Sequence, residues 1–404
     1  MANVSSSNGL EKRPKLAFRR ADGSSFPGWS RTSLSSIIEP YSEKVYGEHK
    51  YEVLTSSREG LQRQVDHFGS EQRHDTDGYN VIPFGYCTYR NRSDDGRFAF
   101  NINTISSNAI VSKFYPVFRF TNANSLFMSE FLNSSSRAKK KLSVLAVGTS
   151  QVVLSFEALK AAEFDLPCKD EQDKIASFFE CLNRRIEYQR TLVDALKKYK
   201  RGLVFQVFKE NNPFGIEVKP VPMTELLAEY RNRNTSGLRV CSVAVNKGVV
   251  DQIEHLGRSF SAADTSNYGR VKPGDVVYTK SPTGSFPYGI VKQNFLNEEV
   301  AVSPLYGVYT PCSRDIGYLL HIYFEQHQNA NNYIRTLAQK GAKNTINIST
   351  AHFLEKSIMF PTHEEDIAFL ANMFSKVTAK IAQTETEYDL LCSQRLAFML
   401  QLFI

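Results

Sequence analysis

Several short segments combine basic side chains with amide or small side chains, a composition suited to contacting a polyanion. Arg90, Asn91 and Arg92 are consecutive, and an acidic turn separates them from Arg97. Their guanidinium and amide groups can donate paired hydrogen bonds to base edges or phosphate oxygens. The alternative is an ordinary solvated surface loop, because basic loops are common.

Other segments share this character and are also expected in loops. Residues 137–141 follow three serines and suit phosphates better than bases, residues 231–234 read Arg-Asn-Arg-Asn, and residues 340–344 place two lysines around a glycine that allows close backbone approach. Lys280 is a weaker candidate, and Tyr278 beside it is expected to pack within a strand. The candidate DNA-contacting residues are therefore Arg90, Asn91, Arg92, Arg97, Arg137, Lys139, Lys140, Lys141, Arg231, Arg233, Lys280, Lys340, Lys343 and Asn344.

Motifs for catalysis are not found in the sequence. It has no Gly-x-x-x-x-Gly-Lys phosphate loop and no Asp/Asn-Pro-Pro-aromatic tetrapeptide of the amino-methyltransferases. Residues 273–280 lack the second acidic residue of a two-carboxylate magnesium site, so Asp275 fits a turn entering a strand better. Glu364 and Glu365 stand where a helix is expected to begin and where its dipole favours acids. We therefore expect no active site, metal or cofactor in this chain.

The bulk composition indicates a folded protein of two to three domains. The chain has 404 residues, a net charge of +7 and six cysteines without paired spacing, which we expect to be buried free thiols in a reducing cytoplasm. No apolar stretch reaches the roughly 18 residues of a membrane span. The first 29 residues begin with a serine-rich stretch and are expected to form a disordered leader and a lead-in.

Two long segments repeat one amphipathic pattern at a constant offset of 195 residues. In the first copy, apolar positions within residues 175–207 alternate in steps of four and three. Two polar residues, Gln189 and Lys200, interrupt the pattern, and the second copy has Thr384 and Arg395 at the matching places. A spacing held this long is typical of a helix that packs along another helix. The chain is therefore predicted to be an internal duplication, each repeat ending in a long helix.

The polar interruptions favour antiparallel pairing of these helices. In parallel register Lys200 would face Arg395, and two like charges would share a poorly solvated site. In antiparallel register Lys200 faces Val377 and Arg395 faces Leu182, so each charge is expected to reach solvent along its stem. The first segment has ten Lys and Arg against seven Asp and Glu, and the second has three against six. These opposite charges also favour pairing with each other.

The predicted fold class is α+β, with two globular blocks separated by an intramolecular antiparallel coiled coil of approximate two-fold symmetry. The blocks contain short strand-like runs divided by turn residues. The expected segments are a leader and lead-in at 1–29, the first block at 30–166, a central helix at 167–212, the second block at 213–357 and a C-terminal helix at 358–404.

This order of segments resembles the specificity subunit of type I restriction-modification enzymes. Residues 166–176 read Leu-Pro-x-x-x-Glu-Gln-x-x-Ile-Ala, and residues 200–203 read Lys-Arg-Gly-Leu. In the second repeat Asp366 replaces the expected Gln, and residues 395–398 read Arg-Leu-Ala-Phe. The resemblance covers nearly the whole chain and depends on the order and duplication of its parts more than on any single motif.

The resemblance implies a non-catalytic DNA-binding subunit of a prokaryotic, cytoplasmic type I system. Each block would be a target recognition domain that reads half of a bipartite double-stranded DNA target. The helices would set the spacer and dock two methyltransferase subunits, while S-adenosylmethionine, ATP and magnesium would be bound by the methyltransferase and motor/nuclease subunits. The alternatives are a methyltransferase-only or other non-type-I assembly, and a coiled-coil scaffold that binds only proteins.

Overall fold

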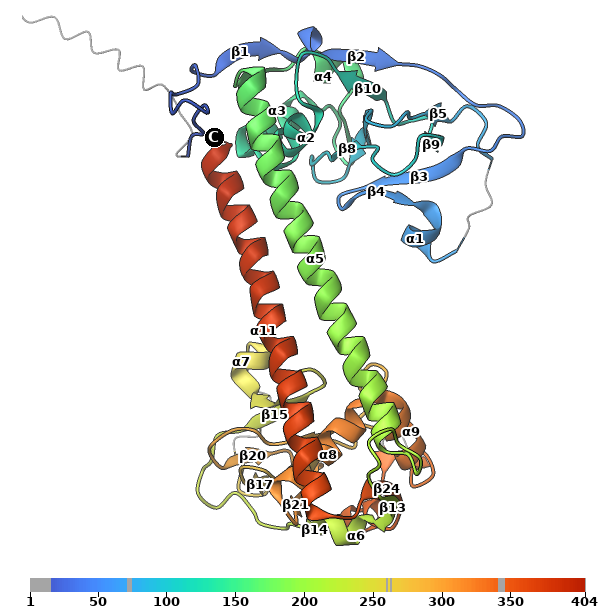
Figure 1. Cartoon of the computed structure of the whole chain (residues 1–404), viewed down its shortest axis with the longest axis vertical. Coiled ribbons are helices and arrows are strands. Elements are labelled where there is room, and N and C mark those ends of the chain that lie inside the picture. The colour runs from blue at the N-terminus through green and yellow to red at the C-terminus, as the bar shows by residue number, and fades with distance from the viewer. Residues whose placement is uncertain (1–15, 71–74, 259–260, 262–263, 341–345, 404) are drawn as a thin grey trace, which may run out of the picture. The chain divides into compact units, whose positions relative to one another are not determined.

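The chain forms two compact units, each of which contains one end of two long helices. The computed structural model describes residues 16–70, 75–258, 261, 264–340 and 346–403. Unit 1 comprises residues 1–189 and 387–404, and unit 2 comprises residues 190–386. Helices α5 (Lys169–Val207) and α11 (Glu364–Leu402) are each 39 residues long and contribute to both units (Figure 1). The predicted mixed fold class with a pair of long helices is therefore confirmed.

Unit 1 contains a four-stranded sheet in the order β2-β10-β6-β8 and a second in the order β4-β3-β9-β5, with the smaller pairs β1-β12 and β7-β11 beside them. Its elements are β1 (Ser30–Ser33), the 3-10 helix η1 (Leu34–Ser36), β2 (Ile38–Tyr41), β3 (Glu52–Ser57), β4 (Gly60–Arg63), α1 (Gln64–Phe68), β5 (Asn80–Val81), β6 (Cys87–Tyr89), β7 (Arg92–Ser93), β8 (Phe100–Ile102), β9 (Ala109–Val111), β10 (Val117–Phe120), α2 (Ser125–Ser134), α3 (Ser136–Leu145), β11 (Val152–Val153), α4 (Phe156–Lys160) and β12 (Glu163–Leu166).

Aromatic side chains form much of the core of unit 1. Tyr89 of β6 stacks on Phe100 of β8, with ring centroids 5.0 Å apart, and both are fully buried. Phe127 of α2 contacts Phe403 near the end of α11, and Phe403 in turn stacks on Phe179 of α5. The ends of the two long helices therefore belong to the hydrophobic core of this unit, which holds them to the sheet.

The lead-in packs against the same core. Trp29 lies edge-on to Phe127 and Phe131 of α2, with centroids 6.5 Å apart in each case. Phe18 contacts Phe178 of α5, and the Leu16 amide donates to the Gln401 carbonyl at 3.4 Å. Residues 1–15 of the expected leader lie outside the described residues.

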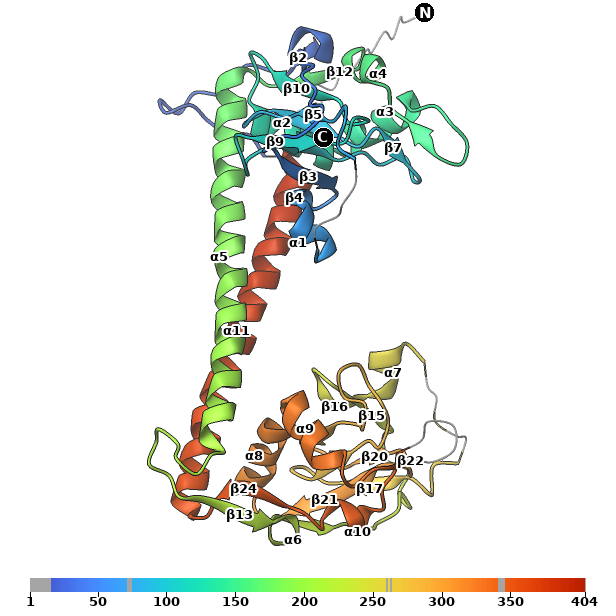
Figure 2. The same ribbon diagram turned by 90° about the vertical axis from the view of Figure 1, so that its right-hand side faces the viewer.

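Unit 2 repeats this succession of elements. The sheet β14-β21-β18-β19 corresponds to β2-β10-β6-β8, and β13 pairs with β24 as β1 pairs with β12. The hairpin β15-β16 with α7 corresponds to β3-β4 with α1 (Figure 2). Its elements are β13 (Val218–Pro222), α6 (Met223–Leu226), β14 (Leu227–Glu229), β15 (Cys241–Ala244), β16 (Gly248–Asp251), α7 (Gln252–Leu256), β17 (Gly269–Val271), β18 (Val276–Tyr278), β19 (Val291–Gln293), β20 (Val300–Val302), β21 (Gly307–Pro311), α8 (Arg314–Glu325), α9 (His327–Ile334), β22 (Gln339–Lys340), β23 (Ile346–Asn347), α10 (Thr350–Phe353) and β24 (Ser357–Pro361).

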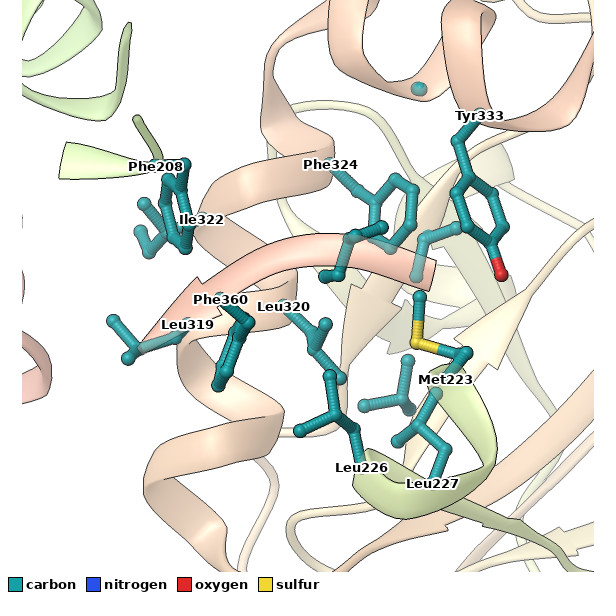
Figure 3. Close-up of a cluster of buried hydrophobic side chains, with 14 of the residues drawn as sticks. Phe208, Met223, Leu226, Leu227, Leu319, Leu320, Ile322, Phe324, Tyr333 and Phe360 are labelled. Atoms are coloured by element: carbon teal, nitrogen blue, oxygen red, sulfur yellow. The ribbon is translucent and has the colours of Figure 1, made fainter. Parts of the chain in front are cut away.

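The core of unit 2 gathers the same kinds of elements. Leu319 and Leu320 of α8, Met223 of α6 and Phe360 of β24 lie in one buried cluster (Figure 3). Leu203 and Val207 of α5 and Leu370 and Phe374 of α11 belong to that cluster as well. The duplicated sequence pattern thus corresponds to a duplicated topology, in which α5 follows β12 and α11 follows β24.

The long helices run antiparallel within each unit. In unit 1, Phe178 contacts Phe398 with ring centroids 5.1 Å apart, and Gln189 donates to Glu387 at 2.8 Å. Later residues of α5 therefore contact earlier residues of α11, which means that the two helices run in opposite directions. In unit 2, the Lys197 ammonium lies 2.6 Å from a Glu385 carboxylate oxygen. The antiparallel arrangement predicted from the polar interruptions is therefore confirmed.

The expectation that the seam charges reach solvent is wrong. Lys200 is mostly buried, and its Nζ lies 2.6 Å from Oε2 of Glu325 on α8. Arg395 donates to Asn183 at 2.5 Å and lies 2.6 Å from Oε1 of Glu130 on α2. Each charged group pairs instead with a carboxylate from a helix of its own unit, because that helix covers the end of the side chain.

The expectation of six buried thiols is also wrong in part. All six cysteines are free, but only Cys87 and Cys241 are buried, whereas Cys181 and Cys312 are exposed. Asp275, by contrast, has the predicted turn role: it is buried, accepts the Lys272 amide at 2.8 Å and precedes β18. Among the described helices, none has the length and apolar character needed to cross a bilayer.

Candidate nucleic-acid interface

A hollow in unit 1, here called the basic hollow, is lined by four arginines. Two of them, Arg90 and Arg92, follow β6, Arg97 precedes β8, and Arg58 lies in the turn between β3 and β4. The full lining is Ser56, Ser57, Arg58, Arg90, Arg92, Ser93, Asp94, Arg97 and Ala99. Three predicted residues thus share one site, and four guanidinium groups face a single lining carboxylate.

Buried hydrogen bonds bring the separated segments of the hollow together. The Asn101 side chain in β8 donates to Ser56 Oγ and to the Ser57 carbonyl, each at 2.8 Å, which fixes the end of β3 against β8. The buried Tyr89 hydroxyl at the end of β6 donates to the Leu154 carbonyl at 3.0 Å. These contacts place the Arg58 turn beside the segment that carries Arg90 to Arg97.

Asp95 holds the acidic turn, residues 94–96, in place through several contacts. Its Oδ1 accepts from Ser93 Oγ at 2.9 Å and from the Arg97 amide at 3.2 Å, and it lies 2.6 Å from Arg58 Nη2. The hydrogen bond from Ser93, followed by those from the Arg97 amide and Arg58, holds the pKa of this carboxyl below its usual value. Asp95 is therefore ionised at neutral pH and orients Arg58, while the exposed pair itself contributes little stability.

Aromatic and glycine residues complete the surroundings. The Arg92 guanidinium lies 5.6 Å from the ring centroid of Phe114, which is itself exposed. Gly96 has a φ of +72°, and a Cβ there would lie 2.7 Å from Ser143 Oγ, so the acidic turn abuts α3. Stacking on an aromatic face orients a guanidinium without neutralising its charge.

The basic residues 137–141 lie in helix α3 and do not form the expected loop. Ser135 caps this helix by accepting the Ala138 amide at 3.2 Å. Lys141 Nζ donates to the Glu163 carbonyl at 2.7 Å, and Arg137 lies 4.0 Å from Asp165, so these two are engaged within the unit. Lys139 and Lys140 are exposed. The serines that precede the lysines were thus a helix cap signal as much as a loop signal.

In unit 2, Glu229 is close to two of the predicted residues. Arg231 Nε lies 2.7 Å from Glu229 Oε1, and this contact with Arg231 is the main reason that the pKa of Glu229 is lowered. Burial lowers the pKa of Lys280, which Glu229 opposes electrostatically. Lys280 follows β18 as Asn91 follows β6, so the corresponding loop of each unit carries basic residues.

The remaining predicted residues are less clearly placed. Arg233 is exposed, whereas its neighbour Asn234 is buried and accepts the Leu238 amide at 2.7 Å, which is a structural role. Lys340 is the last residue of strand β22. Lys343 and Asn344 lie outside the described residues. Tyr278 is buried in β18, as expected, and donates to the Tyr288 carbonyl at 2.7 Å.

Two residues near the hollow were missed by sequence reasoning. Arg58 stands alone between a serine and a glutamate, and Phe114 follows Lys113 in a segment with ordinary strand-flanking composition. Both residues are brought to the hollow by tertiary contacts with residues 20 to 40 positions away, Arg58 with Asp95 and Phe114 with Arg92. Among the residues that the structure describes, no cluster of three His, Cys, Asp or Glu side chains could hold a metal ion.

The fold and the hollow define a protein with two similarly built α+β units, one of which concentrates arginines at a surface suited to a polyanion. Residues 39–198, which include the whole basic hollow, match the family model of the type I restriction modification DNA specificity domain. The matched segment is therefore similar to a type I DNA specificity domain over about two fifths of the chain. No curated protein matches the sequence.

Solved structures extend this similarity to the fold of nearly the whole chain. The type I restriction-modification S subunit from M. genitalium matches with a TM-score of 0.58 and 13% identity, over 97% of this chain and 99% of that one. A chain from a structural study of complex assembly and conformational transition of the type I R-M system matches with a TM-score of 0.50 and 16% identity, over 93% and 98% of the two chains. The HsdS subunit from Thermoanaerobacter tengcongensis has a TM-score of 0.46 and 16% identity, over 93% and 97%. The match to the M. genitalium protein shows that nearly the whole chain shares the fold of that S subunit.

Proposed function

We propose that this chain is the non-catalytic DNA-recognition subunit of a type I restriction-modification complex, and that the basic hollow of unit 1 binds one half of a bipartite target. The observation that carries the proposal is the convergence of Arg58, Arg90, Arg92 and Arg97 on one hollow inside the segment that matches the DNA specificity model. Nothing in the local sequence requires Arg58 to join the other three.

The chemistry of the hollow favours DNA over a small anion. Guanidinium groups donate bidentate hydrogen bonds to phosphates and to the O6 and N7 atoms of guanine. Arg58 and Arg97 share the carboxylate of Asp95, while Arg92 is oriented over Phe114. Exposed ion pairs of this kind contribute at most about 1 kcal/mol, so their arginines can exchange the carboxylate for phosphate at little cost.

We further propose that unit 2 reads the other half of the target and that the helices set the spacer between the halves. The repeated order of elements supports two similar readers, and Arg231, Arg233 and Lys280 are the candidates in the second. A span of 32 residue steps in a helix corresponds to about 48 Å, somewhat more than one turn of B-DNA. In this proposal the helices also dock two methyltransferase chains, and S-adenosylmethionine, ATP and magnesium are bound by partner chains.

The proposal is tested by measuring duplex binding by the full-length chain as a function of salt. Replacing Arg58 or Arg90 with Ala should weaken binding and reduce the slope of log K against log salt by about 1 for each phosphate contact that is lost. Arg119→Ala is the matched control, because this exposed arginine of unit 1 pairs with Glu39 on β2, away from the lining of the hollow. Equal effects in all three variants, or no duplex binding by the parent chain, would contradict the proposal and favour a protein-only scaffold.

A further inference from the structure

A short β-ribbon beside the basic hollow aligns one arginine with two valines. Arg92 in β7 is directly opposite Val153 in β11, and Ser93 is opposite Val152. On the other side of β11, Val147 and Val153 exchange both backbone hydrogen bonds, at 3.0 and 2.8 Å. Strands β7 and β11 and the bridged residue Val147 therefore place Val147, Val153 and Arg92 in one row across the ribbon.

The row faces outward. Residues directly opposite each other in antiparallel strands point to the same face, and successive residues point to opposite faces. Val152 packs against the core and Ser93 is buried, so their face is the inner one. Val153, Arg92 and Val147 consequently share the outer face, where Val147 is 78% exposed and Arg92 is also exposed.

The tip of the ribbon is held in place by its own geometry. Gly148 has a φ of +140°, and a Cβ there would lie 2.3 Å from the Gln151 carbonyl oxygen, so the turn closes tightly on a residue that only glycine suits. Gln151 Nε2 donates to Asp94 Oδ1 at 3.0 Å, which ties the turn to the acidic turn of the hollow. The ribbon and the hollow thus form one preorganised surface.

We infer that Val147, Val153 and Arg92, the reading row, enter the major groove and that Val147 contacts the C5-methyl group of a thymine. This inference rests on the proposed function, since it assigns a base contact to the same DNA-binding surface. The major groove is wide enough for a two-stranded ribbon, and the thymine methyl is the one apolar group on its floor. Val147 can contact this methyl group, and the Arg92 guanidinium on the same face can contact a base edge or a phosphate.

The strand spacing sets the distance between the two contacts along the groove. Neighbouring strands lie about 4.8 Å apart, so the backbones of Val147 and Arg92 are separated by about 10 Å. With a rise of about 3.4 Å per base pair, the thymine and the base pair or phosphate contacted by Arg92 lie within a few base pairs of each other. The surrounding arginines supply the charge complementarity that brings the ribbon to the duplex.

The test couples a single methyl group to a single side chain. Duplexes preferred by the full-length chain are selected from a random-sequence pool, and each thymine is then replaced in turn by deoxyuridine, which lacks only the methyl. For one thymine, the replacement should weaken binding by the parent chain roughly three- to fourfold, the value expected for one buried methyl group. Val147→Ser should lose the same factor with thymine and nothing further with deoxyuridine, because the two changes remove one contact.

Val144→Ser is the matched control. Val144 is 76% exposed on α3, in the same unit but outside the reading row, so this variant should keep the full sensitivity to deoxyuridine. A selected sequence in which no thymine couples to Val147, or in which Val144 couples equally, overturns the reading row and leaves the proposed function standing. If the parent chain shows no preference among duplexes, both the reading row and the proposed function are overturned.

Discussion

Arg395 of α11 pairs with Glu130 of α2 through two contacts, from Nη2 to Oε1 at 2.6 Å and to Oε2 at 2.9 Å. Its counterpart in the duplicated pattern, Lys200 of α5, pairs with Glu325 of α8 in unit 2 through one contact, from Nζ to Oε2 at 2.6 Å. The same interruption in each helix is thus met by a carboxylate from the helix that follows the four-stranded sheet. The interruptions fasten each long helix to a globular part, which gives the matched breaks in the two sequences a physical reason.

Removal of Arg395 should destabilise unit 1. We expect Arg395→Met to lower the free energy of unfolding by about 1–3 kcal/mol, because Glu130, whose side chain is 19% exposed, would lose its cationic partner and keep only the hydrogen bond from Asn183. Combining Arg395→Met with Glu130→Gln should cost less than the sum of the single changes, which a double-mutant cycle in chemical denaturation measures. Arg31→Ala, at an exposed pair with Glu163, should change stability by less than about 1 kcal/mol. Additive effects of Arg395 and Glu130 would show that they do not stabilise each other.

Periodicity was sufficient to predict the helices but not the partners of their polar residues. The 195-residue offset and the like charges at Lys200 and Arg395 favoured antiparallel packing, and both units have it. The carboxylate that meets Arg395 lies 265 residues earlier in the chain. A residue at that separation becomes a neighbour only through the tertiary fold, so a pattern along one helix contains no information about it.

The candidate interface was predictable to a similar degree. Arg90, Arg92 and Arg97 belong to one short segment, and the fold does bring them to one hollow. Arg58 is supplied by another hairpin through the hydrogen bonds of Asn101, which no local pattern reveals. Conversely, Lys141 looked available in the sequence but donates to a backbone carbonyl of β12.

The stability of unit 2 should decrease as the pH falls below about 6.5. His321 is buried, and its burial, together with Lys292 and Lys200, lowers its pKa well below the usual 6.5. Below that pH the unfolded chain binds a proton that the folded unit does not, so stability is lost by up to about 1.4 kcal/mol for each pH unit.

His321→Asn tests this assignment, because its side-chain oxygen can replace Nδ1 as the acceptor for the Gln293 amide, now 3.2 Å away. Between pH 7.5 and 5.5, chemical denaturation should show a loss about 1.4 kcal/mol smaller in the variant than in the parent. The other titrating groups are common to both proteins and cancel in the comparison. Equal losses would exclude His321 as the group responsible.

Gly148→Ala should impair sequence preference more than general DNA affinity. The added Cβ would meet the Gln151 carbonyl and force the tip of the ribbon to shift, whereas Arg58, Arg90 and Arg97 lie outside the strands of the ribbon and keep their charge at the hollow. We expect binding of a preferred duplex to fall about tenfold and binding of a scrambled duplex to change little, measured at one salt concentration. Gly28→Ala, at a site in unit 1 with open space around the new Cβ, is the control. A uniform loss on both duplexes would mean that the tip serves only the fold.

Exchange of residues 213–357 for the corresponding block of a related chain should change only one half of the recognised sequence. Unit 2 has its own sheet and its own buried core, so its reading surface can be replaced without altering the basic hollow of unit 1. Sequencing of duplexes selected by the chimera, or of the adenines methylated by a complex that contains it, gives the result. Changes in both halves would refute independent reading.

Lengthening both long helices should lengthen the spacer of the target by a predictable amount. One heptad inserted after Gln189 in α5 and one after Thr386 in α11 adds about 10.5 Å, or about three base pairs of B-DNA. A heptad rotates an α-helix by only about 20° from its original phase, so the apolar seam stays continuous and the units keep their relative facing. The selected duplexes should therefore retain both half-sites, now separated by about three additional base pairs. In the control, the same heptad sequence replaces the seven residues that follow Gln189 and the seven that follow Thr386, so the helices keep their length and the spacer should not change. A chimera with longer helices and an unaltered spacer would show that the helices do not set the distance between the two readers.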